Sequence, residues 1–332
     1  MRLEILSLRN VSISSLHQAF TDLVRWRGRF YCVFREGTAH ASYDGRCVVL
    51  ASDDLERWEV ASVLAGGKYP DIRDPKFLPT DDALFVYCPA WNHPAPDDLR
   101  FDGEHRLSVM SHTQDSRHWA GVTPVYEPGW AFWRPILHDH GYFVAANHLG
   151  KDRRDGEERC VSLLRSEDGR TWEHVSDIRR GEGSNETALC ALEDGRLVAL
   201  VRREFRPKGS PLPLPDVLAF AEPPYAEWQC TELDRVIQGP NICRLGNRLI
   251  AGGRTYGSPY SDLIPHAAQM TLLELDLEEK TTRTIAYLPS WGDCSYPGFL
   301  PLSDEELAVS YYSSHEGRSQ VYVGRVRLRW EV

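Results

Sequence analysis

Six tight-turn signals, each followed by a run of apolar residues, divide this chain into parts of nearly equal length. The second residues of the six turns are Gly28, Asp82, Gly141, Gly195, Asn247 and Glu305. Asp194-Gly195, for example, precedes a β-forming run, which is typical of a β-hairpin because glycine readily adopts the positive φ of a tight turn. The turns recur every 52 to 59 residues across all 332 residues, and a period of this length predicts a propeller or a solenoid.

A second repeat runs in phase with the first. It is a heptapeptide with a hydroxyl residue first, an aspartate third and a tryptophan last. The copies are Ser52–Trp58, Thr113–Trp119 and Ser166–Trp172, and a degenerate fourth copy keeps only Trp228. Hydroxyl and carboxylate side chains at this spacing favour a β-turn in which they bond their own backbone. We expect each tryptophan to pack into a sheet core, so the heptapeptides indicate fold rather than chemistry.

Each repeat is predicted to contain four strands, with the hairpin turn after the first strand and the heptapeptide turn after the third. The chain is therefore predicted to be all-β, a six-bladed β-propeller of four-stranded antiparallel blades that forms a single domain over residues 1–332. Residues 3–13 and 320–328 are both typical of strands. We expect these two end segments to pair within one blade, because closing the ring removes exposed sheet edges.

Composition and charge exclude several classes of function. The net charge is −10, with no basic stripe, which argues against binding to nucleic acid. No apolar stretch is long enough to span a membrane, and the first residues lack the apolar core of a signal peptide. The eight cysteines show no metal-type spacing such as C-x-x-C. We therefore expect free thiols, no metal, no cofactor, no membrane partner and a cytoplasmic location, with a secreted mature form as the alternative.

Polar residues recur where the first strand of each repeat is predicted to begin. The six openings are Thr21-Asp22-Leu23, Arg73-Asp74-Pro75, Trp133-Arg134-Pro135, Asn185-Glu186-Thr187, Pro240-Asn241-Ile242 and Ser295-Tyr296-Pro297. The first strand of a propeller blade is the innermost one, so these residues should face the central pit. A protein core does not need ionisable groups at equivalent positions, which indicates a functional site there.

The second strand of each repeat carries another pattern. Seven residues beyond the six turn positions lie Arg35, Pro89, His148, Arg202, Arg254 and Tyr312. Three of these are arginines, and arginine binds a carboxylate through two parallel hydrogen bonds. We therefore predict that Arg35, Arg202 and Arg254 converge on a substrate carboxylate. The long loops at residues 89–105 and 204–216 are expected to shape the same site.

The chain resembles the sialidase superfamily, and in particular bacterial sialidase-like proteins with BNR-type repeats. The resemblance spans the whole length, and the heptapeptides resemble the Asp-boxes of that family. The segments that carry it are Ala19–Leu23, Phe34–Gly37, Arg73–Lys76, Asn185–Thr187, Gly239–Asn241, Gly253–Arg254, Gly292–Gly298 and Ser310–Gly317. The resemblance implies Tyr296 as a nucleophile, Glu186 as its base, and Arg202 and Arg254 as two arginines of a carboxylate-binding triad.

The implied chemistry is consistent with these residue types. A phenol titrates near pH ~10, so a tyrosine needs an adjacent carboxylate base to attack at neutral pH. A neutral nucleophile also avoids repulsion from an anionic sugar. The chain departs from the family pattern in two places. The inner strand at Phe20–Leu23 lacks the first arginine, for which Arg35 is the candidate replacement. The acid/base is also unassigned, with Asp44, His40, Asp22 and Asp74 as candidates.

Further residues are predicted to bind the substrate, which we expect to be an anionic carbohydrate. They are Arg73, Trp133, Asn241, Asp293, Tyr312, His315 and Glu316. The leading hypothesis is a glycoside hydrolase of the sialidase type that acts on an acidic sugar. Alternatives are a glycosidase that uses the carboxylates Asp22, Asp74 and Glu186, a lyase for uronic-acid polymers with tyrosine and histidine as base and acid, and a glycan-binding propeller without catalytic activity.

Overall fold

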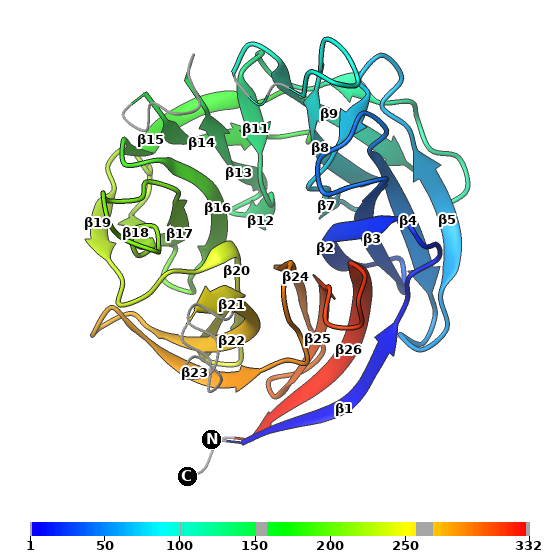
Figure 1. Ribbon diagram of the computed structural model, residues 1–332. Helices are drawn as coiled ribbons and strands as arrows, with labels where there is room; N and C mark the ends of the chain where they lie inside the picture. Colours follow the sequence, from blue (N-terminus) through cyan, green and yellow to red (C-terminus); the bar gives the residue numbers. More distant parts are fainter. Residues whose placement is uncertain (1, 100, 102, 151–157, 257–267, 330–332) are drawn as a thin grey trace.

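Six antiparallel sheets surround a central axis in the computed structural model, as Figure 1 shows. The structure describes residues 2–99, 101, 103–150, 158–256 and 268–329. Within these ranges the chain forms strands, turns and loops and no helix, and therefore no helix long enough to cross a membrane. The protein is thus a six-bladed β-propeller of four-stranded antiparallel blades, which confirms the predicted fold class.

Blades one to three contain the first half of the chain. Their strands are β2 (His17–Trp26), β3 (Arg29–Gly37), β4 (Arg46–Ser52) and β5 (Glu59–Leu64); β6 (Asp71–Ile72), β7 (Lys76–Pro79), β8 (Leu84–Trp91), β9 (Arg106–Thr113) and β10 (Thr123–Pro124); and β11 (Trp130–Phe132), β12 (Ile136–His138), β13 (Gly141–His148), β14 (Cys160–Ser166) and β15 (Glu173–Arg180). In blades two and three the innermost strand is split into two short pieces, which are β6 with β7 and β11 with β12.

Blades four to six contain the rest. Their strands are β16 (Ser184–Ala191), β17 (Leu197–Arg203), β18 (Val217–Ala221) and β19 (Gln229–Glu232); β20 (Gln238–Leu245), β21 (Arg248–Tyr256), β22 (Ala268–Asp276) and β23 (Thr281–Tyr287); and β24 (Cys294–Pro301), β25 (Glu306–Ser313), β26 (Gln320–Arg329) and β1 (Arg2–Asn10). Strand β1 pairs antiparallel with β26, as Figure 1 shows. The two end segments therefore close the ring as predicted, although β1 ends at Asn10 and not at residue 13.

The hairpin and heptapeptide turns lie together at one face of the ring, because β4 ends beside the start of β3 and the other blades repeat this register. In the first heptapeptide, Ser52 Oγ accepts a hydrogen bond from the Leu55 amide. Asp54 Oδ1 accepts hydrogen bonds from the amides of Glu56 and Arg57. The second and third copies repeat these bonds. Side chains thus bond their own backbone in all three turns, as the spacing predicted.

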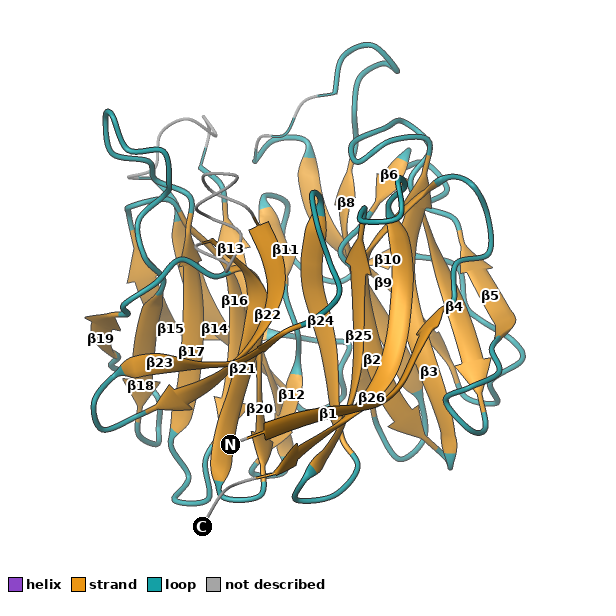
Figure 2. Ribbon diagram, turned by 60° about the horizontal axis from the view of Figure 1, so that its bottom comes forward, coloured by secondary structure: helices purple, strands orange, loops and turns teal. Residues whose placement is uncertain are grey.

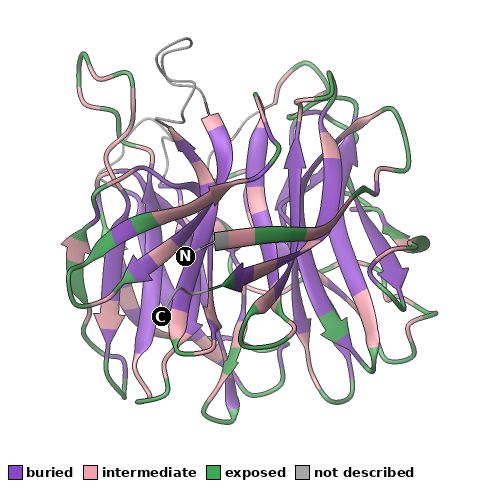
Figure 3. Ribbon diagram, turned by 90° about the horizontal axis from the view of Figure 1, so that it is seen from below, coloured by how far each residue is buried: buried purple, intermediate pink, exposed green. Residues whose placement is uncertain are grey.

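The hydrophobic core lies between neighbouring blades and not inside a single sheet. Val33 and Val49 of the first blade, for example, pack in one cluster with Phe77 and Val86 of the second. Figure 3 shows buried residues along most strands, and exposed ones in the loops and turns and on outer strands such as β5 and β19. All eight cysteines are free, as expected from their spacing. This arrangement leaves the axis to the polar residues of the innermost strands.

These polar residues do not begin the innermost strands, contrary to the prediction. They lie at an interruption within each strand, where the pairing with the second strand shifts or stops. At this point Phe20, Asp74 and Tyr296 have positive φ angles of 63°, 47° and 51°. Such bulges leave residues unpaired and re-aim their side chains. The polar residues therefore reach the central pit because the strand is broken there.

The two faces of the ring differ in their loops. Figure 2 shows long loops projecting from the upper face, whereas the connections at the lower face are short. The short connections include the hairpin turns, and the longer loops follow the second strand of several blades. Loops placed on a rigid scaffold commonly shape binding sites. The site is therefore expected where the second strands end.

Candidate active site

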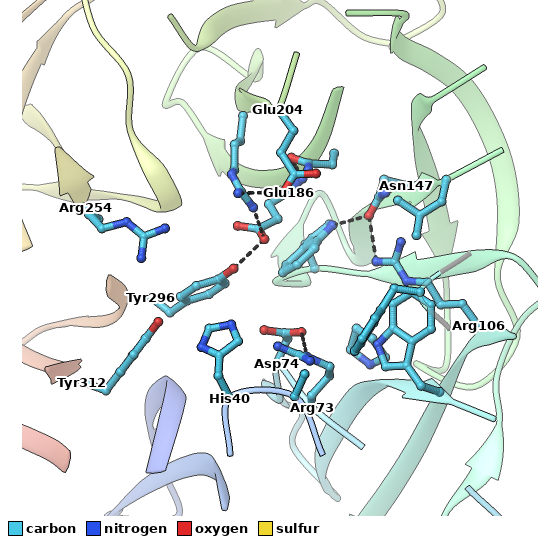
Figure 4. Close-up of a pocket in the computed structure, with 18 residues that line it drawn as sticks. His40, Arg73, Asp74, Arg106, Asn147, Glu186, Glu204, Arg254, Tyr296 and Tyr312 are labelled. Carbon is cyan, nitrogen blue, oxygen red and sulfur yellow. Dashed lines mark hydrogen bonds and ion pairs between the residues drawn. The ribbon is translucent and has the colours of Figure 1, made fainter. Parts of the chain in front are cut away.

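A pocket of about 220 Å³ lies on the axis and is lined by residues from all six blades (Figure 4). Several lining residues are at or near the ends of second strands, which places the pocket on the face opposite the hairpin turns. The complete lining is His40, Ala41, Arg73, Asp74, Pro89, Trp91, Phe101, Arg106, Trp133, Asn147, Leu149, Asn185, Glu186, Arg202, Glu204, Arg254, Tyr296 and Tyr312. The pocket thus contains most of the predicted site residues.

Tyr296 and Glu186 meet at the centre of the pocket, although they are 110 residues apart in sequence. The Tyr296 hydroxyl donates a hydrogen bond to Glu186 Oε1 over 2.5 Å. Arg202 forms an ion pair with the same carboxylate oxygen. Glu186 Oε2 is buried and has no hydrogen-bond partner among the described residues. The interruptions of β24 and β16 therefore bring a phenol, a carboxylate and a guanidinium into one chain of contacts (Figure 4).

Burial and neighbouring charges set the protonation of this pair. Burial raises the pKa of Glu186, and nearby Asp74 adds to this, while Arg202 acts in the opposite direction. Burial and the adjacent Glu186 carboxylate raise the pKa of Tyr296 well above its ordinary value. The phenol is therefore protonated in the empty site. Glu186 is a stronger base than an exposed carboxylate, which suits it to accept the phenolic proton.

Two of the three predicted arginines lie in the pocket. Arg202 donates from Nη2 to Glu204 Oε1 over 2.9 Å and from Nε to Gln238 Oε1 over 2.8 Å. Arg254 Nη1 lies 3.5 Å from Asp293 Oδ1. Both guanidiniums are thus held by carboxylates of the protein while still lining the pocket. This geometry agrees with the predicted position of Arg202 and Arg254 beside Tyr296.

The third predicted arginine, Arg35, does not reach the pocket. It is completely buried and pairs with Asp71 of the second blade, with 2.7 Å between Nε and Oδ1. Its two other nitrogens donate to the Ala39 carbonyl and the Ser42 hydroxyl, both over 2.8 Å. The loop after β3 therefore covers Arg35, and with Asp71 it engages each of the three guanidinium nitrogens. The prediction that Arg35 binds a substrate carboxylate is wrong for this physical reason.

Arg73 and Asp74 line the pocket beside Tyr296 (Figure 4). Arg73 Nε is 3.1 Å from Asp74 Oδ2, and Arg73 Nη1 is 3.6 Å from Asp71 Oδ2. The guanidinium also lies over the Phe20 ring, 4.7 Å from its centroid. Asp74 is thus the pocket carboxylate that could act on a substrate in addition to Glu186 and Glu204.

His40 enters the pocket from the loop after β3, and Asp293 holds it from behind. The His40 Nδ1 to Asp293 Oδ2 distance is 2.7 Å, and His17 Nε2 is 3.2 Å from the same oxygen. The Tyr312 hydroxyl donates to Asp293 Oδ1 over 2.8 Å. Although burial opposes it, hydrogen bonding from both histidines holds the pKa of Asp293 well below its usual range. Asp293 thus orients the pocket residues His40 and Tyr312.

His17, His40 and Asp293 together form a candidate metal site that the sequence spacing did not reveal. One ligand atom from each of His17, His40 and Asp293 lies within 4.8 Å of the other two, a group found by searching the described residues. Two imidazoles and a carboxylate suit several divalent metals. However, hydrogen bonds from the two imidazoles and Tyr312 already satisfy Asp293 without an ion.

Several predicted site residues do not line the pocket. Asp22 forms an ion pair with Arg134 and accepts from the Leu23 and Phe77 amides. Asn241 is buried and bonds the Pro297 carbonyl and the Ile242 amide. These two residues join neighbouring inner strands, so the predictions that they act on substrate are wrong.

Three other candidates face away from the pocket. His315 packs against the ring of Tyr322 at 4.9 Å between ring centroids, and Glu316 accepts a hydrogen bond from the Tyr322 hydroxyl. Asp44 is exposed and accepts from the Thr38 amide, as expected of a turn residue. These side chains form contacts with the loop or with β26. The predictions for His315, Glu316 and Asp44 are therefore also wrong.

One wall of the pocket contains Arg106 and Asn147, which the sequence patterns did not indicate. Arg106, the first residue of β9, is only 5% exposed and donates from Nη2 to Asn147 Oδ1 over 3.1 Å. Its guanidinium lies over the Trp91 ring, 5.3 Å from the centroid. Asn147 also accepts from Trp133 Nε1 over 2.7 Å. Arg106 is paired with Trp91 at the end of β8, so third-strand residues opposite the second-strand ends were the missing signal.

Comparison with known proteins supports the fold and leaves the activity open. No family model matches the chain, and no curated protein matches it in sequence. Among solved structures, a protein of unknown function from Dyadobacter fermentans is 18% identical, with a TM-score of 0.80 and coverage of 98% of this chain and 99% of that one. An α-L-arabinofuranosidase from Fusarium graminearum is 12% identical, with a TM-score of 0.71 and coverage of 96% and 97%.

A sialidase from Trypanosoma rangeli is also similar, at 11% identity and a TM-score of 0.69. The match covers 98% of this chain but only 58% of the sialidase, so the chain spans little more than half of that protein's length. These likenesses show that the chain has the sialidase-like six-bladed fold. Fold does not determine activity, so any function must be argued from the pocket itself.

Proposed function

We propose that this protein is a glycoside hydrolase that removes an acidic sugar from a glycan, with Tyr296 as nucleophile and Glu186 as its base. The observation that carries the proposal is the 2.5 Å hydrogen bond from the Tyr296 hydroxyl to Glu186 Oε1 inside a pocket on the propeller axis. A nucleophile bonded to a base that a third group orients is the general arrangement for covalent catalysis. Here Arg202 is the third group.

In the first step, Tyr296 Oη attacks the anomeric carbon while Glu186 accepts the phenolic proton. The glycosidic bond breaks, and a general acid protonates the departing oxygen. The product is a tyrosyl glycoside with inverted anomeric configuration. In the second step, the acid/base removes a proton from water, which attacks the same carbon and releases Tyr296, and the phenol regains its proton from Glu186. Two inversions give net retention.

The proposed substrate is anionic because the pocket has cationic groups next to the nucleophile. Arg202 and Arg254 both line it, and each interacts electrostatically with Tyr296. A carboxylate on the sugar would be bound by these guanidiniums through charge-assisted hydrogen bonds. An uncharged tyrosine is a suitable nucleophile for such a sugar, since a carboxylate nucleophile would repel it.

Two pocket residues are candidates for the acid/base. Asp74 lies beside Tyr296 and is paired with Arg73. His40 also lines the pocket, and Asp293 fixes its ring through Nδ1, which resembles the histidine–aspartate arrangement of other hydrolases. Loss of whichever residue is the acid should matter most for poor leaving groups, which separates the two candidates.

The first test is hydrolysis of aryl glycosides of sialic, ulosonic and uronic acids by the wild-type protein and by Tyr296→Phe. We expect turnover with retained configuration and a loss of about 10³-fold or more in kcat in the variant. Turnover that survives in Tyr296→Phe would overturn the assignment and leave a mechanism based on Asp74 and Glu186. A product with an unsaturated, ultraviolet-absorbing ring would indicate a lyase, and tight binding without turnover would indicate a glycan-binding protein.

A further inference from the structure

Arg106 differs from the other arginines of the pocket in having no acidic partner within the part of the chain that the structure describes. Arg73, Arg202 and Arg254 each lie within 4 Å of at least one carboxylate. Among the described residues, no carboxylate lies at salt-bridge distance from Arg106, and Nη2 alone of its guanidinium nitrogens donates a hydrogen bond. The side chain is nevertheless 95% buried. A positive charge is thus held at the pocket wall with only neutral partners among the described residues.

The neighbourhood of Arg106 has more donors than acceptors. Asn147 Oδ1 accepts from both Arg106 Nη2 and Trp133 Nε1. Arg106 Nε and Asn147 Nδ2 are buried and have no hydrogen-bond partner among the described residues. An unsatisfied buried donor, and still more an unpaired buried charge, costs free energy. A ligand group that accepts hydrogen bonds and carries negative charge would satisfy these donors and neutralise the guanidinium.

Burial of Arg106 also affects its pKa. Burial lowers its pKa to about 9, although Asp74 and Glu186 act from a distance in the opposite direction. The guanidinium remains charged at neutral pH. The Trp91 ring lies 5.3 Å from the guanidinium carbon and, with Asn147, contacts the group at the pocket wall. A fixed cation of this kind is prepared for an anionic ligand.

The wall that contains Arg106 is separate from the wall that contains the nucleophile. Figure 4 shows Arg106 and Asn147 at one side of the pocket and Tyr296, Tyr312 and Arg254 at the other, with Arg73, Asp74 and His40 between them. Tyr296, which the proposed mechanism places at the cleaved sugar, is thus at one side of the pocket and Arg106 is at the other. An anion beside Arg106 is therefore assigned to another part of the substrate than the carboxylate beside Arg254.

We propose that Arg106, Asn147 and Trp91 form a second anion-binding subsite, which takes an acidic group on the sugar next to the one that is cleaved. This rests on the proposed function for the identity of the cleaved sugar. The substrate class is then a glycan with negative groups on adjacent residues, such as an oligosaccharide of hexuronic acids or one with a sulfated second sugar. Both share an anionic oxygen cluster that a guanidinium binds.

The test compares two disaccharides that share the same acidic terminal sugar, one linked to a hexuronic acid and the other to the matching neutral hexose. We expect wild-type kcat/KM to favour the doubly acidic disaccharide by about 10- to 100-fold, the range for a hydrogen bond to a charged group. Arg106→Met should reduce this ratio at least tenfold. A matched control is Arg170→Met, which removes an arginine that lies over the Phe85 ring outside the pocket and should leave the ratio unchanged.

A binding measurement separates this proposal from the hydrolase proposal. Calorimetric titration of Tyr296→Phe with both disaccharides, and with a disaccharide sulfated on its second sugar, does not require turnover. Preference for an acidic second sugar that depends on Arg106 would support the subsite even if no hydrolysis is found. The carboxylated and sulfated ligands show which anion fits. If Arg106→Met leaves the preference of the enzyme and of Tyr296→Phe unchanged, the subsite proposal is overturned, whatever the outcome for hydrolysis.

Discussion

The two walls of the pocket differ in how their charges are balanced. On the wall with the nucleophile, Glu186 is paired with Arg202, and Arg202 also pairs with Glu204. On the opposite wall, Arg106 has only the neutral side chain of Asn147 as a hydrogen-bond partner among the described residues. The arginines of the first wall are thus neutralised by protein carboxylates before any substrate carboxylate reaches them, whereas the charge of Arg106 is not. Each wall therefore makes different predictions for substitution.

The largest effect is expected from Glu186→Gln, on the wall with the nucleophile. The substitution keeps the size of the side chain and removes the base, so Tyr296 must lose its proton without an acceptor. We expect kcat to fall by about 10²- to 10⁴-fold, with a smaller change in KM. Initial rates on an aryl glycoside that the wild-type protein cleaves provide the measurement.

The pH profile sharpens this prediction. Glu186 must be unprotonated to act as a base, and its pKa is raised by burial. Wild-type kcat/KM should therefore fall as the pH decreases through a value above the ordinary ~4.3 of a glutamate. That acidic limb should be absent in Glu186→Gln. An unchanged acidic limb in the variant would show that another group is the base.

A smaller effect is expected at the acid/base, which lies between the two walls. Loss of a general acid matters most when the leaving group is a poor one. For the residue that acts as acid, we expect about 10²-fold loss with an alkyl leaving group and little loss with a nitrophenyl group. Asp74→Asn and His40→Asn, measured with both substrates, each serve as the control for the other. Equal losses with both leaving groups in both variants would exclude the two residues as the acid.

Periodicity in the sequence identified the fold and the wall with the nucleophile, but it did not identify the opposite wall, which contains Arg106. Equivalent positions in the repeat located Glu186, Tyr296, Arg202 and Arg254 because each blade directs its inner strand and the end of its second strand to the axis. The same rule was wrong for Arg35, which has the same strand position as Arg202. The loop after β3 folds over Arg35, and Asp71 of another blade neutralises it. No spacing within one repeat encodes such a contact.

The wall with Arg106 was not predicted from the sequence, for a related reason. Arg106 begins a third strand, as Arg46 begins β4, but Arg46 pairs with the Glu36 carboxylate, whereas Arg106 bonds the neutral side chain of Asn147. Its role depends on the residue beside it in the sheet, Trp91, and on Asn147 from the third blade. Likewise, Asp22 and Asn241 matched the pattern of pit-facing residues but are used to join inner strands. The repeat thus predicts the backbone position of a side chain, whereas the residues that the side chain contacts belong to other blades.

The smallest predicted effects are on stability, and the two walls should respond with opposite signs. Arg202→Met leaves the buried Glu186 without its cation, which should destabilise the protein by about 3 kcal/mol. Arg106→Met removes a buried charge that has no carboxylate partner and keeps an apolar side chain against Trp91, so it should stabilise the unliganded protein by about 1 kcal/mol. Thermal unfolding in a buffer without sulfate or phosphate measures both. Destabilisation by Arg106→Met would mean that Arg106 is part of the structural framework, and the distinction between the two walls would then fail.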